Sequence, residues 1–261
     1  MRRINRFDLT RLRAGLKPFR LHFFPRLRST NDHAALLRKR GELFAPAVVL
    51  TAHQLAGRGR GGNTWWSGSP GSLTVTFVFA ADEHLAPYHV PLIAGLAVRA
   101  AASQITGIDE IQVKWPNDLQ HHGRKLAGLL CERVFKADLI GIGMNVNVPR
   151  TRFPAALRES VTSLSAIADR EFDLTDALIV IAQQMHRALS HRDEHSFAAA
   201  MRDYNHHHAL LGRRVTVLGN GTEQPAITGT CEGLDSMGRL LLRDRRRRTV
   251  HRVIAGHVQA I

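Results

Sequence analysis

A glycine-rich loop between two apolar segments constrains this chain more than any other feature. Residues 54–67 read Gln-Leu-Ala-Gly-Arg-Gly-Arg-Gly-Gly-Asn-Thr-Trp-Trp-Ser, and the apolar segment 47–52 comes directly before them. Residues 72–79 follow, and their alternating side chains are typical of a strand with one face in the core. We therefore predict a loop whose two ends are held by strands, which gives a mobile segment a rigid frame.

The residues of this loop suit an anionic ligand. Its four glycines allow the backbone to approach a ligand closely, and Arg58 and Arg60 place positive charge beside the exposed amides. Because glycine loses the most freedom on ordering, we expect the loop to order on binding and to cover a site. The alternative is a surface loop without a ligand, or an RNA-binding segment of the RGG type.

Length and composition limit the class of protein. The 261 residues, 44% of them hydrophobic, are enough for one large domain or for a large and a small one. The longest apolar run, residues 91–105, is interrupted by Arg99 and is shorter than the roughly 20 residues that cross a bilayer. Cys131 and Cys231 provide no disulfide framework, so we expect a cytoplasmic protein. Rossmann and P-loop nucleotide signatures are absent from the sequence.

The positive charge is concentrated near the N-terminus. The chain carries a net charge of +14, and residues 1–40 hold twelve Lys and Arg against Asp8 and Asp32, a local net charge of +10. We predict a basic N-terminal arm over residues 1–19. Such an arm attracts phosphates or acidic proteins, and a solvated arm without a task is the alternative.

The apolar patterns divide the remaining chain into two parts. We predict strands at 20–27, 47–52, 72–79 and 138–147. We also predict a hairpin whose first strand, 111–119, is broken by Pro116 and whose second strand covers 125–133. Helices are predicted after Ser29 or Thr30, over 89–105, and once or twice within 174–204. After residues 206–208, short apolar runs separated by Gly and Asn predict a small β-barrel, so the expected domains are 20–208 and 209–261.

Polar residues on the predicted hairpin indicate a ligand site. Lys114 and Lys125 lie beside an apolar run, where a lysine is costly to bury unless it meets an anion. A phosphate or a carboxylate would meet that need, and solvent-facing lysines on an edge strand are the alternative. Gly141 and Gly143 leave one strand face bare, which allows a ligand or another backbone to approach. Residues 29–31 cap a helix or bind a polar head group. The adjacent histidines 206–208 have no fixed geometry, so we predict no metal site there.

Several motifs occur together in one order. They are Ser29-Thr30-Asn31, Gln54-x-Ala56-Gly57-Arg58-Gly59-Arg60, Trp65-x-Ser67, Lys114-Trp115-Pro116-Asn117-Asp118, Lys125-Leu126-Ala127-Gly128-x-Leu130 and Gly141-x-Gly143-x-Asn145. With them, the chain closely resembles the biotin protein ligase family, strongly over residues 20–148 and loosely in the C-terminal part. The resemblance implies an α+β fold, with a mixed β-sheet flanked by helices in a class II synthetase-like catalytic domain, and a small C-terminal SH3-like β-barrel.

The resemblance also implies a two-step reaction. Biotin and Mg-ATP form biotinyl-5'-AMP, and a specific lysine of a biotin carboxyl carrier protein then takes the biotin. No membrane and no specific DNA are expected as partners, and a homodimer is one assembly open to the chain. Because carrier domains of this kind are often acidic, the basic arm is expected to add affinity for the carrier.

Roles for individual residues follow from the resemblance alone. The residues implied in catalysis are Lys125, Arg60, Asp118 and Lys114. Those implied in binding biotin are Ser29, Thr30, Asn31, Gln54, Arg58, Gly59, Arg60 and Lys125. Those implied in binding ATP and Mg²⁺ are Arg58, Arg60, Trp65, Lys114, Asn117 and Asn145. No resident metal is expected.

The sequence departs from the family pattern in three places. Gly61 and Asn63 stand where relatives often carry further basic residues, which predicts fewer phosphate contacts and weaker retention of the adenylate. Val161 lies where some relatives stack an aromatic ring on adenine, so that stacking is not expected here. About 20 residues precede the first strand, too few for the ~50-residue winged helix of a DNA-binding repressor, so we expect a ligase that does not bind an operator.

Two other functions compete with biotin ligation. A lipoate or octanoate ligase or transferase would have a similar fold, although the glycine-arginine loop and the Lys114 to Asp118 motif favour biotin. A nucleic-acid-binding module would use the basic N-terminus and the run Arg245 to Arg248. That reading leaves the order of the motifs unexplained.

Overall fold

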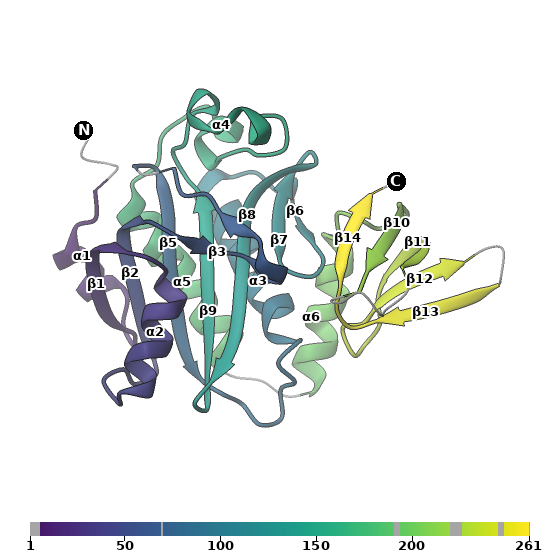
Figure 1. Cartoon of the computed structure of the whole chain (residues 1–261), viewed down its shortest axis with the longest axis horizontal. Helices are drawn as coiled ribbons and strands as arrows, with labels where there is room; N and C mark the ends of the chain where they lie inside the picture. The colour runs from purple at the N-terminus through teal and green to yellow at the C-terminus, as the bar shows by residue number, and fades with distance from the viewer. Residues whose placement is uncertain (1–5, 69, 191–193, 220–225, 245–247, 261) are drawn as a thin grey trace.

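A seven-stranded mixed sheet forms the centre of the larger part of the chain (Figure 1). This computed structural model describes residues 6–68, 70–190, 194–219, 226–244 and 248–260. The strand order is β1-β2-β5-β9-β8-β7-β6, in which β1 and β2 are parallel and every other pair is antiparallel. The strands are β1 (Arg20–Leu27), β2 (Ala47–Gln54), β5 (Ser72–Ala80), β6 (Ile111–Lys114), β7 (Asp118–His121), β8 (Arg124–Val134) and β9 (Ala137–Asn145). The predicted mixed sheet is therefore confirmed.

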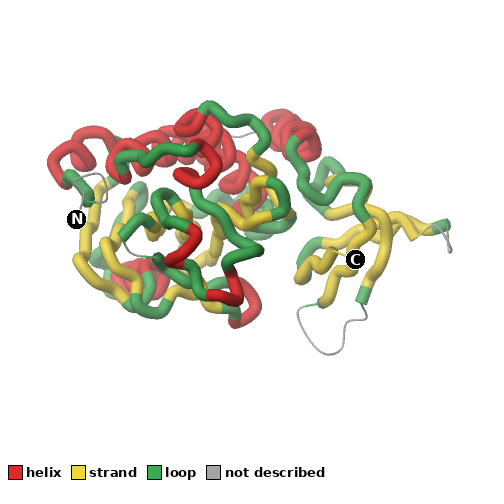
Figure 2. The backbone as a smooth tube through the Cα atoms, turned by 90° about the horizontal axis from the view of Figure 1, so that it is seen from above, coloured by secondary structure: helices red, strands yellow, loops and turns green. Residues whose placement is uncertain are grey.

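Helices cover both faces of this sheet because successive strand side chains point to opposite sides. Val48 and Leu50 pack with α1 (Leu9–Gly15), α3 (Val90–Thr106) and α5 (Leu174–Ser190) in the largest core cluster. Val49 faces the other way and packs with α2 (Thr30–Lys39). Figure 2 shows a layer of helices along one side of the strands. Between β9 and α5 lie η3 (Arg150–Arg152), η4 (Ala155–Leu157) and α4 (Leu164–Ala168). No helix within the described ranges is long and apolar enough to span a membrane.

The predicted first strand of the hairpin, 111–119, is broken at Pro116 as expected, but its two pieces are separate strands that pair with each other. Residues 115–117 form a turn between β6 and β7, and Lys114 pairs with Asp118 across it. Pro116 lacks an amide hydrogen and suits a turn better than the middle of a sheet. The correction places Lys114 and Asp118 side by side.

The N-terminal segment is not an arm from residue 6 onward. Asp8 caps α1 by accepting from the amides of Thr10 and Arg11, and its own amide donates to Thr175 Oγ1 at 3.1 Å. Leu12 and Leu16 are completely buried in the main core. The prediction of a free basic arm over 1–19 is therefore wrong for the segment 8–19, because its apolar residues anchor it to the sheet. Residues 1–5 lie outside the described ranges.

The C-terminal part is a five-stranded antiparallel sheet that follows α6 (Glu194–His206). Its order is β13-β12-β11-β10-β14, with β10 (Arg214–Leu218), β11 (Ile227–Leu234), β12 (Leu240–Asp244), β13 (Thr249–Val253) and β14 (His257–Ala260). The sequence had indicated four of these strands but not β14. Since β13 and β14 lie at the two ends of the described sheet, a closed SH3-like barrel stays a prediction. Arg245 to Arg247 lie outside the described residues.

One hydrophobic cluster joins the two parts of the chain. Val113 and Trp115 from the central hairpin pack with Val215 and Leu242 of the small sheet. The amide of Ala209 also donates to the carbonyl of Val113 at 2.9 Å. The boundary at residue 209 stays a prediction, and the packing is continuous across it.

Candidate active site

A cavity of about 1030 Å³ lies on the sheet face next to the N-terminus of α2. Its walls come from α2, the glycine loop, the β6–β7 turn, β8, β9, the segment after β9 and the small sheet. All thirteen residues that the sequence singled out for the site line this one cavity: Ser29, Thr30, Asn31, Gln54, Arg58, Gly59, Arg60, Trp65, Lys114, Asn117, Asp118, Lys125 and Asn145. The structure brings the whole predicted set together, whereas their individual roles stay predictions.

Three glycines at the floor of the cavity make room for side chains that pack on the sheet. Gly128 and Gly143 are partners in the pairing of β8 with β9, and Gly141 lies two residues away on the same strand face. A Cβ at position 141 would meet Asn31 Oδ1 at 2.3 Å, and a Cβ at position 143 would meet Trp65 Cε2 at 2.3 Å. Gly141 and Gly143 leave the strand face without side chains of its own, as expected, but the side chains of Asn31 and Trp65 occupy that space. Gly128 was missed as a floor residue because only the strand register reveals it.

The glycine loop forms a small separate sheet over this floor. Strands β3 (Gly57–Arg58) and β4 (Thr64–Trp65) pair with each other, and η2 (Arg60–Gly62) connects them. The amide of Gly59 donates to the carbonyl of Asn63 at 2.7 Å, and the side-chain amide of Asn63 donates to the carbonyl of Arg60. Gly61 and Gly62 have φ angles of +61° and +81°, a region that disfavours other residues. The loop is thus held between two strands as predicted.

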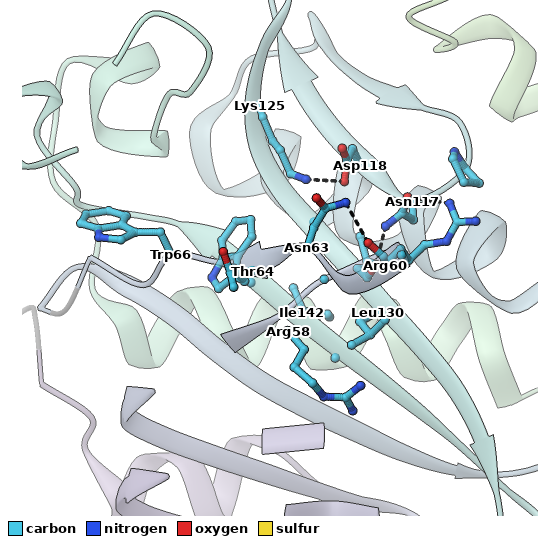
Figure 3. A pocket seen from close by; sticks show the side chains of 18 of the residues that line it. Arg58, Arg60, Asn63, Thr64, Trp66, Asn117, Asp118, Lys125, Leu130 and Ile142 are labelled. Carbon is cyan, nitrogen blue, oxygen red and sulfur yellow. Dashed lines mark hydrogen bonds and ion pairs between the residues drawn. The ribbon is translucent and has the colours of Figure 1, made fainter. Parts of the chain in front are cut away.

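The two loop arginines lie in opposite environments (Figure 3). Arg58 Nη2 lies 2.6 Å from Asp32 Oδ1 and donates to both carboxylate oxygens of Glu132 at 3.0 Å. Burial lowers the pKa of Arg58, but the hydrogen bonds and charges of Glu132 and Asp32 more than compensate and raise it. Arg60 instead donates to the neutral Asn117 Oδ1 at 3.3 Å. Burial lowers the pKa of Arg60, so this cation would gain most from an anionic ligand.

Lys125 and Asp118 form an ion pair at the edge of the glycine floor. Lys125 Nζ lies 2.7 Å from Asp118 Oδ1 and 5.7 Å from the centre of the Trp65 ring (Figure 3). Backbone hydrogen bonds fix Lys125 in place, since its amide donates to the carbonyl of Ser160 and its carbonyl accepts from Thr162. Lys114 also faces the cavity and makes no ion pair with any described residue. Of the two lysines, Lys125 therefore pairs with the carboxylate of Asp118, and Lys114 is left for a ligand.

The end of the cavity at α2 is rich in hydrogen-bonding groups. The amide of Thr30 donates to Gln54 Oε1 at 3.0 Å, and Ser29 Oγ caps the helix at the amide of Asp32. Asn31 accepts from Thr76 Oγ1 at 2.6 Å and donates to Glu132 Oε2 at 2.7 Å. Glu132 was missed by the sequence interpretation, because only the pairing of β8 places it beside α2. The side chain of Asn31 forms its hydrogen bonds with other protein groups. The side chains of Thr30 and Gln54 line the cavity.

Besides Asp118 Oδ1, which is paired with the Lys125 ammonium group, two buried polar atoms of the cavity have no hydrogen-bond partner among the described groups. Asn145 donates through Nδ2 to the carbonyl of Thr162 at 3.0 Å, but its Oδ1 accepts no hydrogen bond. Trp65 Nε1 likewise has no acceptor. An unpaired buried polar group costs about 1–3 kcal/mol, so these two atoms mark where a ligand would offer a donor and an acceptor.

Apolar residues that the sequence interpretation missed close the other end of the cavity. Phe153 and Leu157 line it, and Trp66 packs against Phe153 with ring centres 5.3 Å apart. Val161 also lines it, so the residue that departs from the family pattern does lie in the cavity. His257 of β14 contributes from the small sheet. No sequence pattern indicated His257, because its contact with the cavity depends on how the two parts pack together.

The histidines at 206–208 do not gather metal ligands in the structure. Across the described parts of the chain, no three His, Cys, Asp or Glu residues group in a way that would hold a metal ion. His208 is buried, with its Nδ1 3.7 Å from Cys231 Sγ. Burial lowers the pKa of His208 to about 4, so this side chain is neutral at physiological pH.

Comparisons with known proteins agree with this site. Residues 23–148 match the model of the Biotin/lipoate A/B protein ligase family. The Bifunctional ligase/repressor BirA of Escherichia coli is 30% identical over 84% of this chain and 67% of its own length. The chain belongs to the biotin protein ligase family. A second member, the Biotin--[acetyl-CoA-carboxylase] ligase of Mycobacterium tuberculosis, is 29% identical over 82% of this chain and 79% of its own length.

A solved structure of the biotin protein ligase family has the same fold. The biotin protein ligase from Aquifex aeolicus, in complex with biotin and ATP, superimposes with a TM-score of 0.81 at 27% identity. The match covers 92% of this chain and 97% of that one. The family and the fold are therefore established for the chain, and it is an ATP-dependent enzyme that ligates biotin.

Proposed function

We propose that the cavity beneath the glycine loop binds biotin and Mg-ATP together and joins them at Lys125. The observation that carries this proposal is the pair Lys125–Asp118, 2.7 Å apart, in the cavity that all the predicted site residues line. The biotin ring system would lie toward α2, among Ser29, Thr30 and Gln54. The adenylate would lie toward the apolar end with Phe153 and Val161.

In the first step, the carboxylate of biotin attacks the α-phosphorus of ATP. An oxygen–phosphorus bond forms, the bond to the β-phosphate breaks, and pyrophosphate leaves with its electron pair. Negative charge grows on the phosphate oxygens, and Arg60, Lys114 and Lys125 are the cations that face this region. Such preorganised cations stabilise the transition state without having to reorient. Arg60 is the best suited, because its protein partner Asn117 is neutral.

In the second step, a carrier lysine attacks the acyl carbon of the mixed anhydride. The neutral amine forms an amide bond, AMP leaves with the electron pair of the broken carbon–oxygen bond, and the nitrogen loses its proton. Asp118 is the group that we assign to orienting this amine. Its carboxylate contacts Lys125 Nζ at 2.7 Å, and its backbone pairs with that of Lys114 across the turn. The loop above would keep water from hydrolysing the anhydride.

Magnesium would enter this site with ATP. Mg²⁺ prefers oxygen ligands, and the buried Asn145 Oδ1 accepts no hydrogen bond from the described protein groups. Asn117 offers a second amide oxygen, which Arg60 already contacts. We propose Asn145 as the protein ligand that meets the ion or the triphosphate, with Trp65 Nε1 donating nearby.

The acceptor that we propose is the biotin carboxyl carrier domain of a carboxylase. Two relatives, from M. tuberculosis and Paracoccus denitrificans, are named as ligases of acetyl-CoA carboxylase. These names support a carboxylase as the partner. A cytoplasmic location, a homodimer and the absence of operator binding stay predictions.

The deciding experiment is a mass measurement of the carrier. The protein is incubated with Mg-ATP, a carrier domain and either biotin or lipoate. We expect the carrier to gain the mass of one biotinyl group, and AMP and pyrophosphate to appear only with biotin. Modification by lipoate alone would refute biotin as the substrate, and the absence of vitamin-dependent AMP would refute the ligase.

A further inference from the structure

The first loop arginine is occupied by the protein itself. Arg58 Nη2 contacts Asp32 Oδ1 at 2.6 Å and both oxygens of Glu132 at 3.0 Å. Two carboxylates therefore surround a single guanidinium, and the three side chains together carry a net charge of −1. Arg58 has no charge to spare for a phosphate in this arrangement, unlike Arg60.

The two carboxylates belong to parts of the fold that do not move with the loop. Asp32 lies in the first turn of α2, and Glu132 lies on β8 in the central sheet. Glu132 is held in place because its Oε2 also accepts from the buried Asn31 at 2.7 Å. Asn31 is in turn anchored by Thr76 and by the carbonyl of Leu130. The loop arginine is thus tied to a rigid network.

The rest of the loop makes few contacts with the rigid fold. The backbone bonds of Gly59 and Asn63 stay within the loop, and added Cβ atoms on Gly61 and Gly62 would touch nothing within 4 Å. Arg60 adds one hydrogen bond to Asn117, at the long distance of 3.3 Å. Apart from Trp65, which lies on Gly143 at the end of the loop, Arg58 therefore provides the strongest side-chain connection between the loop and the sheet.

We infer that Asp32 and Glu132 are positioning residues that hold the glycine loop over the reaction site through Arg58. They touch neither the reacting atoms nor, in this role, the substrate. This inference rests on the proposed function, because the closed loop would retain the adenylate until the carrier arrives. Gly61 and Asn63 stand at positions where additional cations would bind phosphate. Retention of the adenylate therefore depends more on closure of the loop in this chain.

The test compares release of the adenylate from matched variants. Asp32→Asn removes one charge, and Glu132→Gln removes the other while keeping an acceptor for Asn31. Adenylate made from labelled biotin is chased with excess unlabelled adenylate, and the label leaving the protein is timed. We expect each variant to release it about two- to fivefold faster, the effect of losing one partly exposed ion pair. The control is Glu83→Gln, which removes an exposed carboxylate that does not line the cavity. This variant should release the adenylate at the wild-type rate.

A double-mutant cycle shows whether the carboxylates act through Arg58. In an Arg58→Gln background, Asp32→Asn and Glu132→Gln should have no further effect on release. The same acceleration with and without Arg58 would overturn the inference, since the carboxylates would then act elsewhere. Unchanged or slower release in the single variants would overturn it as well.

Hydrogen exchange of the loop in the protein without substrates separates this inference from the proposed function. Amides in residues 57–65 should exchange faster in both single variants than in the wild type or Glu83→Gln. If the wild type made no adenylate, the proposed function would fail while exchange would still report the attachment of the loop. Unchanged exchange in both variants would refute the attachment even in an active ligase.

Discussion

The indole ring of Trp65 lies directly on Gly143, so closely that a Cβ at position 143 would meet Trp65 Cε2 at 2.3 Å. Gly143→Ala should therefore push the ring away from the sheet. Overpacking of this kind costs about 1–3 kcal/mol, and we expect the affinity for ATP to fall by about tenfold or more, because Trp65 is placed in the nucleotide site. Isothermal titration with ATP in the presence of biotin measures the change.

A glycine in the helix behind the sheet provides the control. A Cβ on Gly95 would have Val113 Cγ1 as its nearest neighbour, at 4.0 Å. Gly95→Ala should keep the affinity for ATP and stabilise α3 by about 0.5–1 kcal/mol, since alanine loses less freedom in a helix. Wild-type ATP affinity in Gly143→Ala would show that Trp65 does not contribute to the nucleotide site.

Lys125→Ala should abolish the first chemical step. The ammonium group is assigned to the growing charge on the α-phosphate, and removing one such donor lowers the rate by about 10²–10³. Biotin-dependent exchange between ATP and pyrophosphate measures this step without the carrier. Arg124→Ala removes an exposed cation from the preceding position of β8 and should keep the wild-type rate. A wild-type rate of exchange between ATP and pyrophosphate in Lys125→Ala would refute the role of Lys125 at the α-phosphate.

Leu12→Ala should destabilise the whole larger part of the chain. Leu12 is completely buried against the main core, and truncating a buried leucine costs about 2–5 kcal/mol. Arg13→Ala, at the next and exposed position, should change the free energy of unfolding by less than about 0.5 kcal/mol. Urea denaturation at pH 7.5 compares the two. Equal stabilities would mean that α1 is detached in solution. Because of this packing, the affinity of the basic N-terminus for a carrier has to be tested by deleting residues 1–5 alone.

His208 should make the protein less stable in acid. Burial lowers its pKa from 6.5 to about 4 in the folded state, so the unfolded chain binds a proton at higher pH than the folded one. Above pH 6.5, His208 is mostly neutral in both states and the free energy of unfolding is at its full value. As the pH falls toward 4, the unfolded chain takes up the proton first, and the free energy of unfolding decreases. Between pH 7.5 and 5.0, the loss from this residue should be about 2 kcal/mol.

The variant His208→Leu isolates this contribution, because leucine fills the buried site without a titratable group. Other histidines titrate in both proteins, so the quantity to compare is the change in unfolding free energy between the two pH values. We expect the wild type to lose about 2 kcal/mol more than the variant. Equal losses would show that His208 does not stay neutral in the folded protein.

The sequence predicted those parts of the fold that local patterns determine. The strand at 72–79 and the capping residue Ser29 are both correct, because each depends on neighbours in the chain. The expectation that only one face of this strand lies in the core is wrong, since residues 72–79 are buried on both faces. Pro116 also indicated a break, although the prediction continued the strand to residue 119. The helix α1 was missed because many arginines surround Leu12 and Leu16 and hide its short apolar face.

The residues of the site that were missed depend on contacts between distant segments. Glu132 reaches Arg58 across 74 positions of sequence, and Gly128 belongs to the floor only through its register with Gly143. His257 meets the cavity because the small sheet packs against the hairpin. The order of motifs in the sequence was enough to predict the residues that line the site. The supporting residues Glu132, Gly128 and His257 could be recognised only from the structure.

The apolar cluster that joins Val113 and Trp115 to the small sheet has a practical consequence for anyone who wishes to shorten this enzyme. Trp115 separates Lys114 from Asn117, and Val215 and Leu242 shelter it from water. Truncation after residue 208 would expose Trp115 to solvent and would remove the packing that holds the neighbouring Lys114 in the site. A minimal labelling tool built on this scaffold must therefore keep its last five strands.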